Sequence, residues 1–323
     1  MKDWIAVILS AGQGKRMKTE RPKVLHFILD RPIIYYLTDL VSKIVKERYF
    51  IVVSPKLYKI LYKEYEDHLV IQERPLGTGD AVRQLIPFLK EFKGNILVLP
   101  GDVPLIKEET LKLLCEIHEK NNNVCTLLTT YIENPQGYGR IVRDVNGNIL
   151  KIVEEKDATE EEKKIKEVNA SIYAFSWESL KEVLPYLSND NVQKEFYLTD
   201  TISLLLEKGK KIETLMAEPY EVMGINNQLE LADIQRILQE AINRKWMGEG
   251  VSFISPNLTF IGKDAILNKD VIIYPCTFIF GQSYLEKGAK ISSNVMIEDY
   301  YIGENVEIGS FSFISSKLRI KGD

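Results

Sequence analysis

Cysteine and histidine are scarce in this sequence: its 323 residues include three of each. Cys115, Cys125 and Cys276 stand far apart with no CxxC spacing, and the histidines are equally scattered. A disulfide framework and a zinc site are therefore not expected. We expect each cysteine to be a small buried apolar residue instead.

The sequence also lacks a long apolar run and an excess of positive charge. No stretch approaches the roughly 20 apolar residues of a membrane span, and the chain begins on a predicted strand rather than on a basic, cleavable leader. We therefore expect a cytoplasmic protein. Because 42 Lys and Arg residues face 46 Asp and Glu residues without a basic block, a nucleic-acid partner is not expected either.

What the sequence has is an alternation of short apolar runs and amphipathic segments. Apolar residues make up 45% of the chain and charged residues 27%, as in soluble globular proteins. The expected strands are 5–9, 49–53, 69–72, 95–99, 124–130 and 167–175, and the expected helices are 32–46, 58–65 and 78–92. This rhythm predicts an α/β fold with a Rossmann-like, doubly wound parallel sheet. Ligands of such sheets bind at the carboxyl ends of the strands.

The first strand leads into a glycine-bearing turn, Leu9-Ser10-Ala11-Gly12-Gln13-Gly14-Lys15-Arg16. Its two glycines let backbone N–H groups approach phosphate oxygens, and Lys15, Arg16 and Lys23 add positive charge. The spacing fits neither a Walker loop nor a dinucleotide fingerprint, which would need a glycine where Met17 stands. The turn therefore predicts a site for a nucleoside triphosphate. An ordinary turn with solvated basic residues is the alternative.

A second candidate site lies where the apolar strand 95–99 ends in Pro100-Gly101-Asp102. A carboxylate at this edge, on a backbone that a phosphate can approach closely, suits Mg²⁺, because Mg²⁺ prefers oxygen ligands and bridges phosphate oxygens. The alternative is that Asp102 only forms the turn.

Gln72 follows the third expected strand, and Gly77 and Thr78 precede the next helix. A glutamine amide donates and accepts at once, which matches the N3–H and O4 edge of uracil. Gly77 and Thr78 would let the backbone close over the base. The alternative is an ordinary loop in which Thr78 caps the helix.

Residues 137–154 predict a β-hairpin that turns at Asn146-Gly147. Gly139 would bring backbone N–H groups to a sugar hydroxyl. Glu154 is a candidate sugar ligand because a carboxylate accepts hydrogen bonds from pairs of hydroxyls. A surface charge is the alternative for Glu154. The charged run 157–167 is expected to be a solvated helix.

The period of the sequence changes after an amphipathic helix at 228–247. Aliphatic residues then recur every six positions, with one five-residue step, at Ile261, Leu267, Ile273, Ile279, Leu285, Ile291, Ile297, Ile302, Ile308, Ile314 and Ile320. This is the hexapeptide pattern of a short left-handed parallel β-helix. We therefore expect a catalytic domain at 1–227 and a β-helix at 251–323, joined by a linker helix at 228–250.

Together these motifs resemble those of the sugar-phosphate nucleotidylyltransferases. Residues 9–17 with Pro22-Lys23-Val24-Leu25-His26 are most similar to the uridylyltransferase half of the bacterial bifunctional enzyme that makes UDP-N-acetylglucosamine. Residues 72–79 resemble its uridine-recognising segment, and 97–105 its metal-aspartate motif. The resemblance implies transfer of a uridylyl group from UTP to N-acetylglucosamine 1-phosphate, release of pyrophosphate, and Mg²⁺ as cofactor.

The resemblance also implies roles for individual residues. Arg16 and Lys15 would hold the leaving pyrophosphate, Lys23 would stabilise the α-phosphate, and Asn226 would join Asp102 as a metal ligand. The implied nucleotide-binding set is Leu9, Ser10, Ala11, Gly12, Gln13, Gly14, Lys15, Gln72, Gly77, Thr78 and Gly101. The implied sugar-binding set is Gly139, Glu154, Asn169, Glu195 and Tyr197. Taken alone, Asn226 reads as a helix cap.

The sequence departs from the family at Asn169-Ala170-Ser171, where Asn-Thr-Gly is expected. Another sugar 1-phosphate, such as glucose 1-phosphate, is therefore an alternative substrate, and a non-catalytic nucleotide-sugar-binding protein is a further alternative. In the bifunctional enzyme the β-helix continues and carries an acetyltransferase site. The three to four coils here lack the residues that would handle acetyl-CoA, so no acetyl transfer is expected. Such β-helices often form trimers, and we expect a homotrimer.

Overall fold

The structure is a computed structural model that describes residues 3–316. The chain forms two compact units. The first comprises the residues up to Leu25 together with Ile33–Asn226, and the second comprises His26–Pro32 together with the residues from Asn227 on. Residues 26–32, which the sequence placed within the expected catalytic domain, group by their contacts with the second unit.

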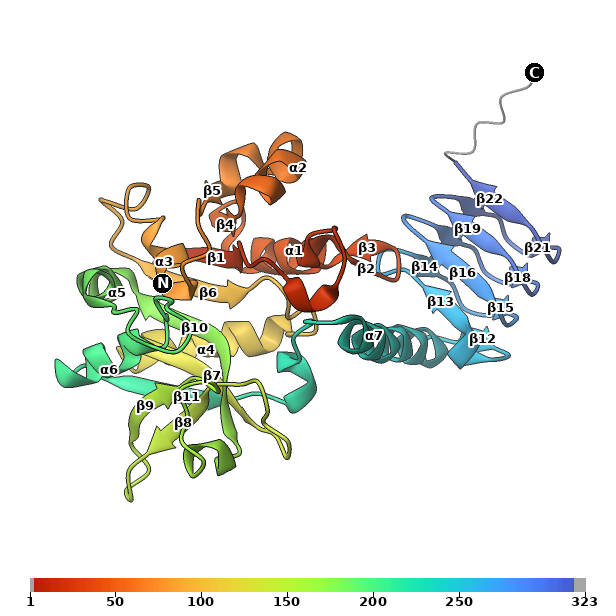
Figure 1. Ribbon diagram of the computed structural model, residues 1–323. Helices are drawn as coiled ribbons and strands as arrows, with labels where there is room; N and C mark the ends of the chain where they lie inside the picture. Colours follow the sequence, from red (N-terminus) through yellow and green to blue (C-terminus); the bar gives the residue numbers. More distant parts are fainter. Residues whose placement is uncertain (1–2, 317–323) are drawn as a thin grey trace. The chain divides into compact units, whose positions relative to one another are not determined.

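The first unit is built on a central sheet in the order β11-β7-β10-β6-β1-β4-β5 (Figure 1). Its strands are β1 (Trp4–Ser10), β4 (Tyr49–Val53), β5 (Leu69–Ile71), β6 (Asn95–Pro100), β7 (Cys125–Tyr131), β10 (Glu167–Ser176) and β11 (Ile212–Met216). The hairpin of β8 (Arg140–Arg143) and β9 (Ile149–Val153) joins this sheet through β8 and β10. The predicted hairpin is confirmed.

The sheet is mixed rather than wholly parallel, which corrects the sequence expectation. Strand β10 runs antiparallel to both β6 and β7. A parallel return to the sheet requires a crossover, usually a helix, but the predicted solvated helix at 157–167 is present only as a 3₁₀ turn, Glu162–Lys164. The chain therefore re-enters the sheet from the β8–β9 hairpin in the opposite direction.

Helices cover both faces of this sheet, so the doubly wound core is confirmed. They are α1 (Ile33–Val45), α2 (Pro55–Tyr65), α3 (Thr78–Arg83), α4 (Glu108–Lys120), α5 (Trp177–Val183) and α6 (Asp200–Glu207). Successive side chains of a strand point to opposite faces. Accordingly Ala6 and Ile8 of β1 pack in a cluster with α1, α2 and α4, whereas Ile5 and Val7 pack in a second cluster with α3, α5 and α6.

Helix α3 is much shorter than the expected helix at 78–92. It ends at Arg83, and the chain continues through turns. Pro87 accounts for part of this difference because proline lacks the N–H that a helix interior needs. The turns are held in place by a buried hydrogen bond of 2.8 Å from Nε1 of Trp177 to the carbonyl of Leu89.

The second unit contains the long helix α7 (Gln228–Gly248), the small hairpin of β2 (Phe27–Ile28) and β3 (Arg31–Pro32), and three stacked sheets of short parallel strands. The sheets are β12-β15-β18-β21, β13-β16-β19-β22 and β14-β17-β20. Their strands are β12 (Ser252–Phe253), β13 (Thr259–Ile261), β14 (Ile266–Leu267), β15 (Ile272–Ile273), β16 (Thr277–Phe280), β17 (Tyr284–Leu285), β18 (Lys290–Ile291), β19 (Met296–Glu298), β20 (Tyr301–Ile302), β21 (Glu307–Ile308) and β22 (Phe313–Ser315).

The sheets form the left-handed parallel β-helix that the hexapeptide pattern predicts. Ile261, Ile279 and Ile297 lie in register on β13, β16 and β19, and all three are fully buried. The other repeat positions up to Ile302 are also buried inside the coils. Ile320, the last predicted position, lies outside the described residues. The repeat thus builds one continuous apolar core along the coils.

Amide side chains of α7 attach that helix to the first coil. Nε2 of Gln239 donates to the carbonyl of Thr259 at 2.8 Å, and Nδ2 of Asn243 donates to the carbonyls of Pro256 and Thr259 at 2.8 and 2.9 Å. At the tip of the β2–β3 hairpin, Oδ2 of Asp30 accepts a hydrogen bond of 2.8 Å from the backbone N–H of Gly281. These contacts explain why residues 26–32 belong to the second unit.

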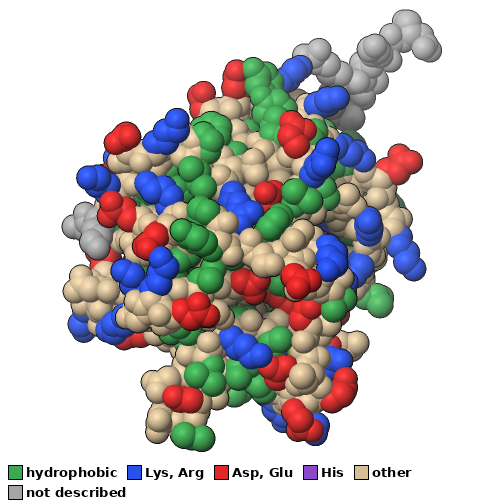
Figure 2. Space-filling model, turned by 60° about the vertical axis from the view of Figure 1, so that its left-hand side comes forward, with side chains coloured by type: hydrophobic (Ala, Val, Ile, Leu, Met, Phe, Trp, Pro, Cys, Tyr) green, Lys and Arg blue, Asp and Glu red, His purple; other side chains and the backbone are tan. Residues whose placement is uncertain are grey.

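Two of the three cysteines match the prediction of buried apolar side chains. Cys115 and Cys125 are buried, but Cys276 is exposed, so the prediction was wrong for Cys276. Cys276 occupies a turn of the β-helix with φ 59°, next to the inward-facing Thr277. No helix in residues 3–316 combines the length and apolar character that crossing a bilayer requires. On the face in Figure 2, the described basic and acidic side chains are interspersed.

Candidate active site

The carboxyl ends of β1 and β6 lie side by side because these two strands pair in parallel. The backbone N–H of Gly101 donates to the carbonyl of Leu9 at 2.8 Å. A Cβ atom at residue 101 would overlap Oγ of Ser10, so only glycine allows this close approach. The predicted phosphate turn and the predicted metal aspartate are thereby brought to one edge of the sheet.

Lys23 lies between the two predicted metal ligands. Its Nζ is in direct contact with Oδ2 of Asp102 and lies 3.4 Å from Oδ1 of Asn226. Nη2 of Arg16 donates to the same oxygen of Asn226 at 2.8 Å. Gly14 has φ 59°, and a Cβ atom there would lie 3.0 Å from Cβ of Lys23. Four side chains from three segments of the chain therefore converge beside the glycine turn.

The position of Asn226 depends on two links to the loop of Asp102. The backbone N–H of Ile225 donates to the carbonyl of Asp102 at 3.0 Å. Glu221, whose side chain is only 3% exposed, accepts at Oε2 from Oγ1 of Thr110 at 2.6 Å and from the backbone N–H of Lys107 at 3.2 Å. Glu221 was not among the residues predicted from the sequence, and its local sequence, with Glu218 three positions before it, carries no signal for this role.

Asn226 is not the helix cap that it suggests when taken alone. The N-cap of α7 is Asn227, whose side chain accepts from the backbone N–H groups of Leu229 and Glu230. The amide oxygen of Asn226 instead accepts from Arg16 and Lys23.

The donor set of Asp102 and Asn226 fits a magnesium ion. Mg²⁺ takes oxygen ligands and is usually held by one or two protein groups plus substrate phosphates. The ammonium of Lys23 contacts Oδ2 of Asp102 and Oδ1 of Asn226. It therefore occupies a position where a cation is favoured. The described residues contain no group of three or more His, Cys, Asp or Glu side chains that could hold a metal without a substrate.

The Gln72 segment pairs with the segment of Glu195 and Tyr197. The backbone N–H of Phe196 donates to the carbonyl of Leu76 at 2.7 Å, and that of Gly79 donates to the carbonyl of Phe196 at 2.8 Å. Gly77, with φ 107°, occupies the N-cap of α3, so Thr78 is not the cap. Oγ1 of Thr78 instead accepts from the backbone N–H of Leu198 at 3.0 Å.

Three of the predicted sugar ligands also lie together. The carbonyl of Gly139 accepts from the backbone N–H of Asn169 at 2.9 Å, and a Cβ atom at residue 139 would lie 3.6 Å from Oε2 of Glu154. Oε1 of Glu154 accepts from Oγ1 of Thr199 at 3.0 Å. Burial raises the pKa of the Glu154 carboxyl, and the nearby Asp200 raises it further. Glu154 is therefore not a free surface charge.

Hydrogen bonds within the protein orient Asn169. Its Oδ1 accepts from the backbone N–H of Ser171 at 3.1 Å, and its Nδ2 donates to the hydroxyl of Tyr173 at 2.6 Å. A register shift between residues 169 and 173 interrupts the pairing of β10 with β7, and Ser171 has φ 59°. The glycine that the family carries at this point adopts such a backbone without strain.

Tyr197 is fixed by two residues that the sequence analysis did not select. Its hydroxyl donates to Oδ2 of Asp157 at 3.1 Å and accepts from Nε2 of Gln193 at 2.9 Å. Asn191 binds both the backbone N–H and the carbonyl of Glu195. Burial raises the pKa of the Glu195 carboxyl.

The nucleotidyl transferase family model matches residues 5–248 of this chain. The bifunctional protein GlmU of Clostridium acetobutylicum is 40% identical over 315 residues, which are 97% of this chain and 69% of that protein. GlmU of Carboxydothermus hydrogenoformans is 41% identical over 312 residues, covering 95% of this chain and 69% of its own. The chain belongs to the nucleotidyl transferase family and, within it, to the GlmU proteins.

The GlmU relationship extends through the β-helix. GlmU of Thermoanaerobacter pseudethanolicus is 37% identical over 321 residues, which are 99% of this chain and 70% of that protein. The chain is therefore a nucleotidyltransferase joined to hexapeptide coils, as the motifs of the first unit and the repeats of the second indicated.

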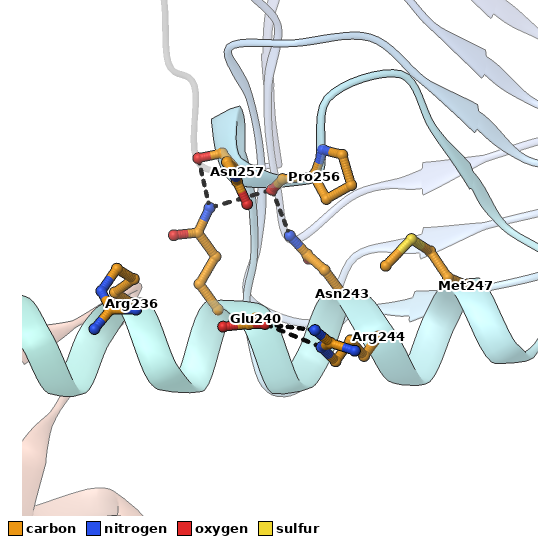
Figure 3. A pocket seen from close by; sticks show the side chains of 8 residues that line it. Arg236, Glu240, Asn243, Arg244, Met247, Pro256 and Asn257 are labelled. Atoms are coloured by element: carbon orange, nitrogen blue, oxygen red, sulfur yellow. Dashed lines mark hydrogen bonds and ion pairs between the residues drawn. The ribbon is translucent and has the colours of Figure 1, made fainter.

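The second unit contains a cavity of its own, of about 580 Å³, on α7 (Figure 3). It is lined by Arg236, Gln239, Glu240, Asn243, Arg244, Met247, Pro256 and Asn257. Among its polar side chains, Arg244 pairs with Glu240, and the amide nitrogens of Gln239 and Asn243 donate to backbone carbonyls. None of its lining residues belongs to the predicted catalytic set.

Proposed function

We propose that the protein transfers a uridylyl group from UTP to N-acetylglucosamine 1-phosphate and releases pyrophosphate. The observation that carries this proposal is the convergence of Arg16, Lys23, Asp102 and Asn226 beside the glycine turn. In this proposal residues 1–227 form the uridylyltransferase domain, 228–250 the linker helix, and 251–323 the β-helix. We also propose that the protein works in the cytoplasm.

The glycine turn would hold the triphosphate of UTP. Backbone N–H groups at Gly12 to Gly14 would contact phosphate oxygens, and Lys15 and Arg16 would hold the leaving pyrophosphate. Lys23 would stabilise the extra negative charge that develops on the α-phosphate as the new bond forms. The sugar phosphate attacks as an anion, so the chain needs to supply no general base.

A magnesium ion held by Asp102 and Asn226 would neutralise charge on the phosphates of both substrates. Glu221 and the Ile225 backbone would keep these two ligands at their separation. The sugar ring would lie against Gly139, Glu154, Asn169 and Glu195, with Tyr197 held by its hydroxyl beside them.

Glucose 1-phosphate or another sugar 1-phosphate remains the second candidate for the acceptor. Ser171 stands where the family carries glycine, and Asn169 already uses both ends of its amide within the protein. Both features alter the wall beside the sugar. Pyrophosphate release over a panel of sugar 1-phosphates and nucleoside triphosphates tests the proposal. Tight UTP binding without any pyrophosphate release would favour the non-catalytic alternative.

We further propose that the β-helix assembles three copies of the chain. Outward-facing apolar residues stack in register on one sheet of the β-helix, namely Phe260, Phe278, Met296 and Phe313. The sheet of β15, β18 and β21 carries Ile272, Lys290 and Glu307 at its outward positions instead. The third sheet carries Ile266, Tyr284 and Tyr301 at its outward positions, and Ile266 and Tyr301 are exposed. Two of the three faces of the β-helix therefore offer apolar or aromatic surface for association. Sedimentation velocity tests the trimer. The absence of acetyl transfer stays a prediction.

A further inference from the structure

The amide of Gln72 is held at one end by two hydrogen bonds. Its Nε2 donates to the carbonyl of Gly77 at 3.1 Å and to Oδ2 of Asp80 at 2.7 Å. Gln72 follows β5 directly, and its backbone N–H donates to the carbonyl of Val53 at 2.9 Å. The residue as a whole is 4% exposed. Both the backbone and the amide nitrogen of this residue are therefore fixed.

The two partners of Nε2 decide the orientation of the amide. A backbone carbonyl accepts hydrogen bonds and cannot donate, and the same is true of an ionised carboxylate. Turning the amide by 180° would place its Oε1 against the oxygens of Gly77 and Asp80 and would break both bonds. The charged partner matters more, because a hydrogen bond to a carboxylate is about twice as strong as one between neutral groups.

This orientation leaves a defined set of groups for a base. Within the part of the chain that the structure describes, Oε1 of Gln72 accepts no hydrogen bond, and the backbone N–H groups of Gly77 and Thr78 donate none. The segment therefore offers one fixed acceptor and two donors. Uracil presents a donor at N3 and an acceptor at O4, whereas cytosine presents an acceptor at N3 and a donor at N4.

We propose that Asp80 is a positioning residue that selects uracil over cytosine by fixing the amide of Gln72. Asp80 does not touch the base. It holds Nε2, so only the acceptor Oε1 faces N3 of the ring, and a ring without an N3–H leaves that acceptor unpaired. This inference rests on the proposed use of UTP. A free glutamine amide donates and accepts hydrogen bonds equally well, so its fixed orientation is what lets the site discriminate between the two pyrimidines.

The test compares the binding of UTP, N3-methyl-UTP and CTP by titration calorimetry without sugar phosphate, and the turnover of UTP and CTP. For the unaltered protein we expect UTP to be preferred over both analogues by about a hundredfold or more, as for a site that leaves a buried polar group unpaired. In Asp80→Asn, the new amide can accept or donate, so Gln72 is able to turn. The preference for UTP over CTP should fall by about tenfold or more, the equivalent of one charge-assisted hydrogen bond. UTP binding itself should change less than fivefold.

Glu73→Gln is the matched control, because it removes a carboxylate from an exposed neighbouring position. It should leave the UTP preference unchanged. An Asp80→Asn protein that keeps the full preference overturns the proposal, and so does an unaltered protein that binds N3-methyl-UTP or CTP as tightly as UTP. The second result needs no variant to fold. A protein that binds UTP selectively but releases no pyrophosphate would refute the proposed reaction and leave this inference standing.

Discussion

Glu221 offers the sharpest test of how the active site is held together. Its buried carboxylate joins the loop of Asn226 to the first turn of α4, through Oγ1 of Thr110 at 2.6 Å and the backbone N–H of Lys107 at 3.2 Å. Asp102 lies five residues before Lys107, and Asn226 lies five residues after Glu221. We therefore expect changes at Glu221 to alter the separation of the two proposed metal ligands.

The expected magnitudes follow from the two hydrogen bonds. Glu221→Gln keeps an acceptor oxygen and loses only the charge, which should cost about 1 kcal/mol of the free energy of unfolding. Glu221→Ala leaves both donors without a partner and should cost about 3 kcal/mol. Removing a group that orients a metal ligand typically weakens metal binding about 10- to 100-fold. We expect a shift in this range for Glu221→Ala and a smaller one for Glu221→Gln.

The assay is pyrophosphate release as a function of Mg²⁺ concentration, paired with Mn²⁺ binding in the presence of UTP measured by electron paramagnetic resonance. Glu109→Gln is the matched control: Glu109 also lies in the first turn of α4, but it is exposed. If Glu221→Ala lowers the free energy of unfolding while the half-saturating Mg²⁺ and Mn²⁺ concentrations stay within twofold of the unaltered protein, the link to the metal ligands is refuted.

Three further predictions concern single positions. Lys23→Ala should lower the turnover rate by about a hundredfold or more. Lys18→Ala, at an exposed position of the same loop, is the control and should change the rate little. Equal turnover rates in the two variants would contradict the role of Lys23. Ser171→Gly should raise the free energy of unfolding by about 1 kcal/mol, measured in urea, because glycine adopts φ 59° without strain; Ser171→Ala, which keeps the strained backbone, should show no such gain. Burial raises the pKa of the Asp30 carboxyl above its ordinary 3.8, so the folded protein binds the carboxyl proton more tightly than the unfolded chain does. The contribution of Asp30 to the free energy of unfolding therefore falls as pH rises through the folded pKa. Asp30→Asn should therefore stabilise the protein at pH 7 and not at pH 3, and a gain of equal size at both would disprove this assignment.

Repeating patterns in the sequence were sufficient to predict most of the fold. The buried run of β1 and the alternation of strands and helices indicated the doubly wound core, and the spacing from Ile261 onward indicated the β-helix. The expectations that failed depended on contacts between distant segments. Helix α3 ends early against turns fixed by Trp177, and β10 runs antiparallel because no crossover helix precedes it.

The residues of the candidate site also fall into those that the sequence indicates and those that only the fold brings together. Lys23, Asp102, Asn226 and Gln72 were selectable from the sequence because they stand in short motifs at strand ends. The residues that hold them were not: Glu221 lies 111 positions from Thr110. Nothing in the local sequence around Glu221 indicates this pairing, since the hydrogen bond exists only once the sheet has brought the two loops together.

By itself, the sequence determined the hydrophobic periodicity of each helix, strand and coil and the residue types at the strand ends. These features depend on side-chain chemistry and on contacts between residues only a few positions apart. Tertiary structure alone decided the direction of β10, the orientation of the Gln72 amide and the convergence of Arg16, Lys23, Asp102 and Asn226 beside the glycine turn. These depend on distances between atoms that are far apart along the chain, and packing of the two apolar clusters against the sheet sets those distances.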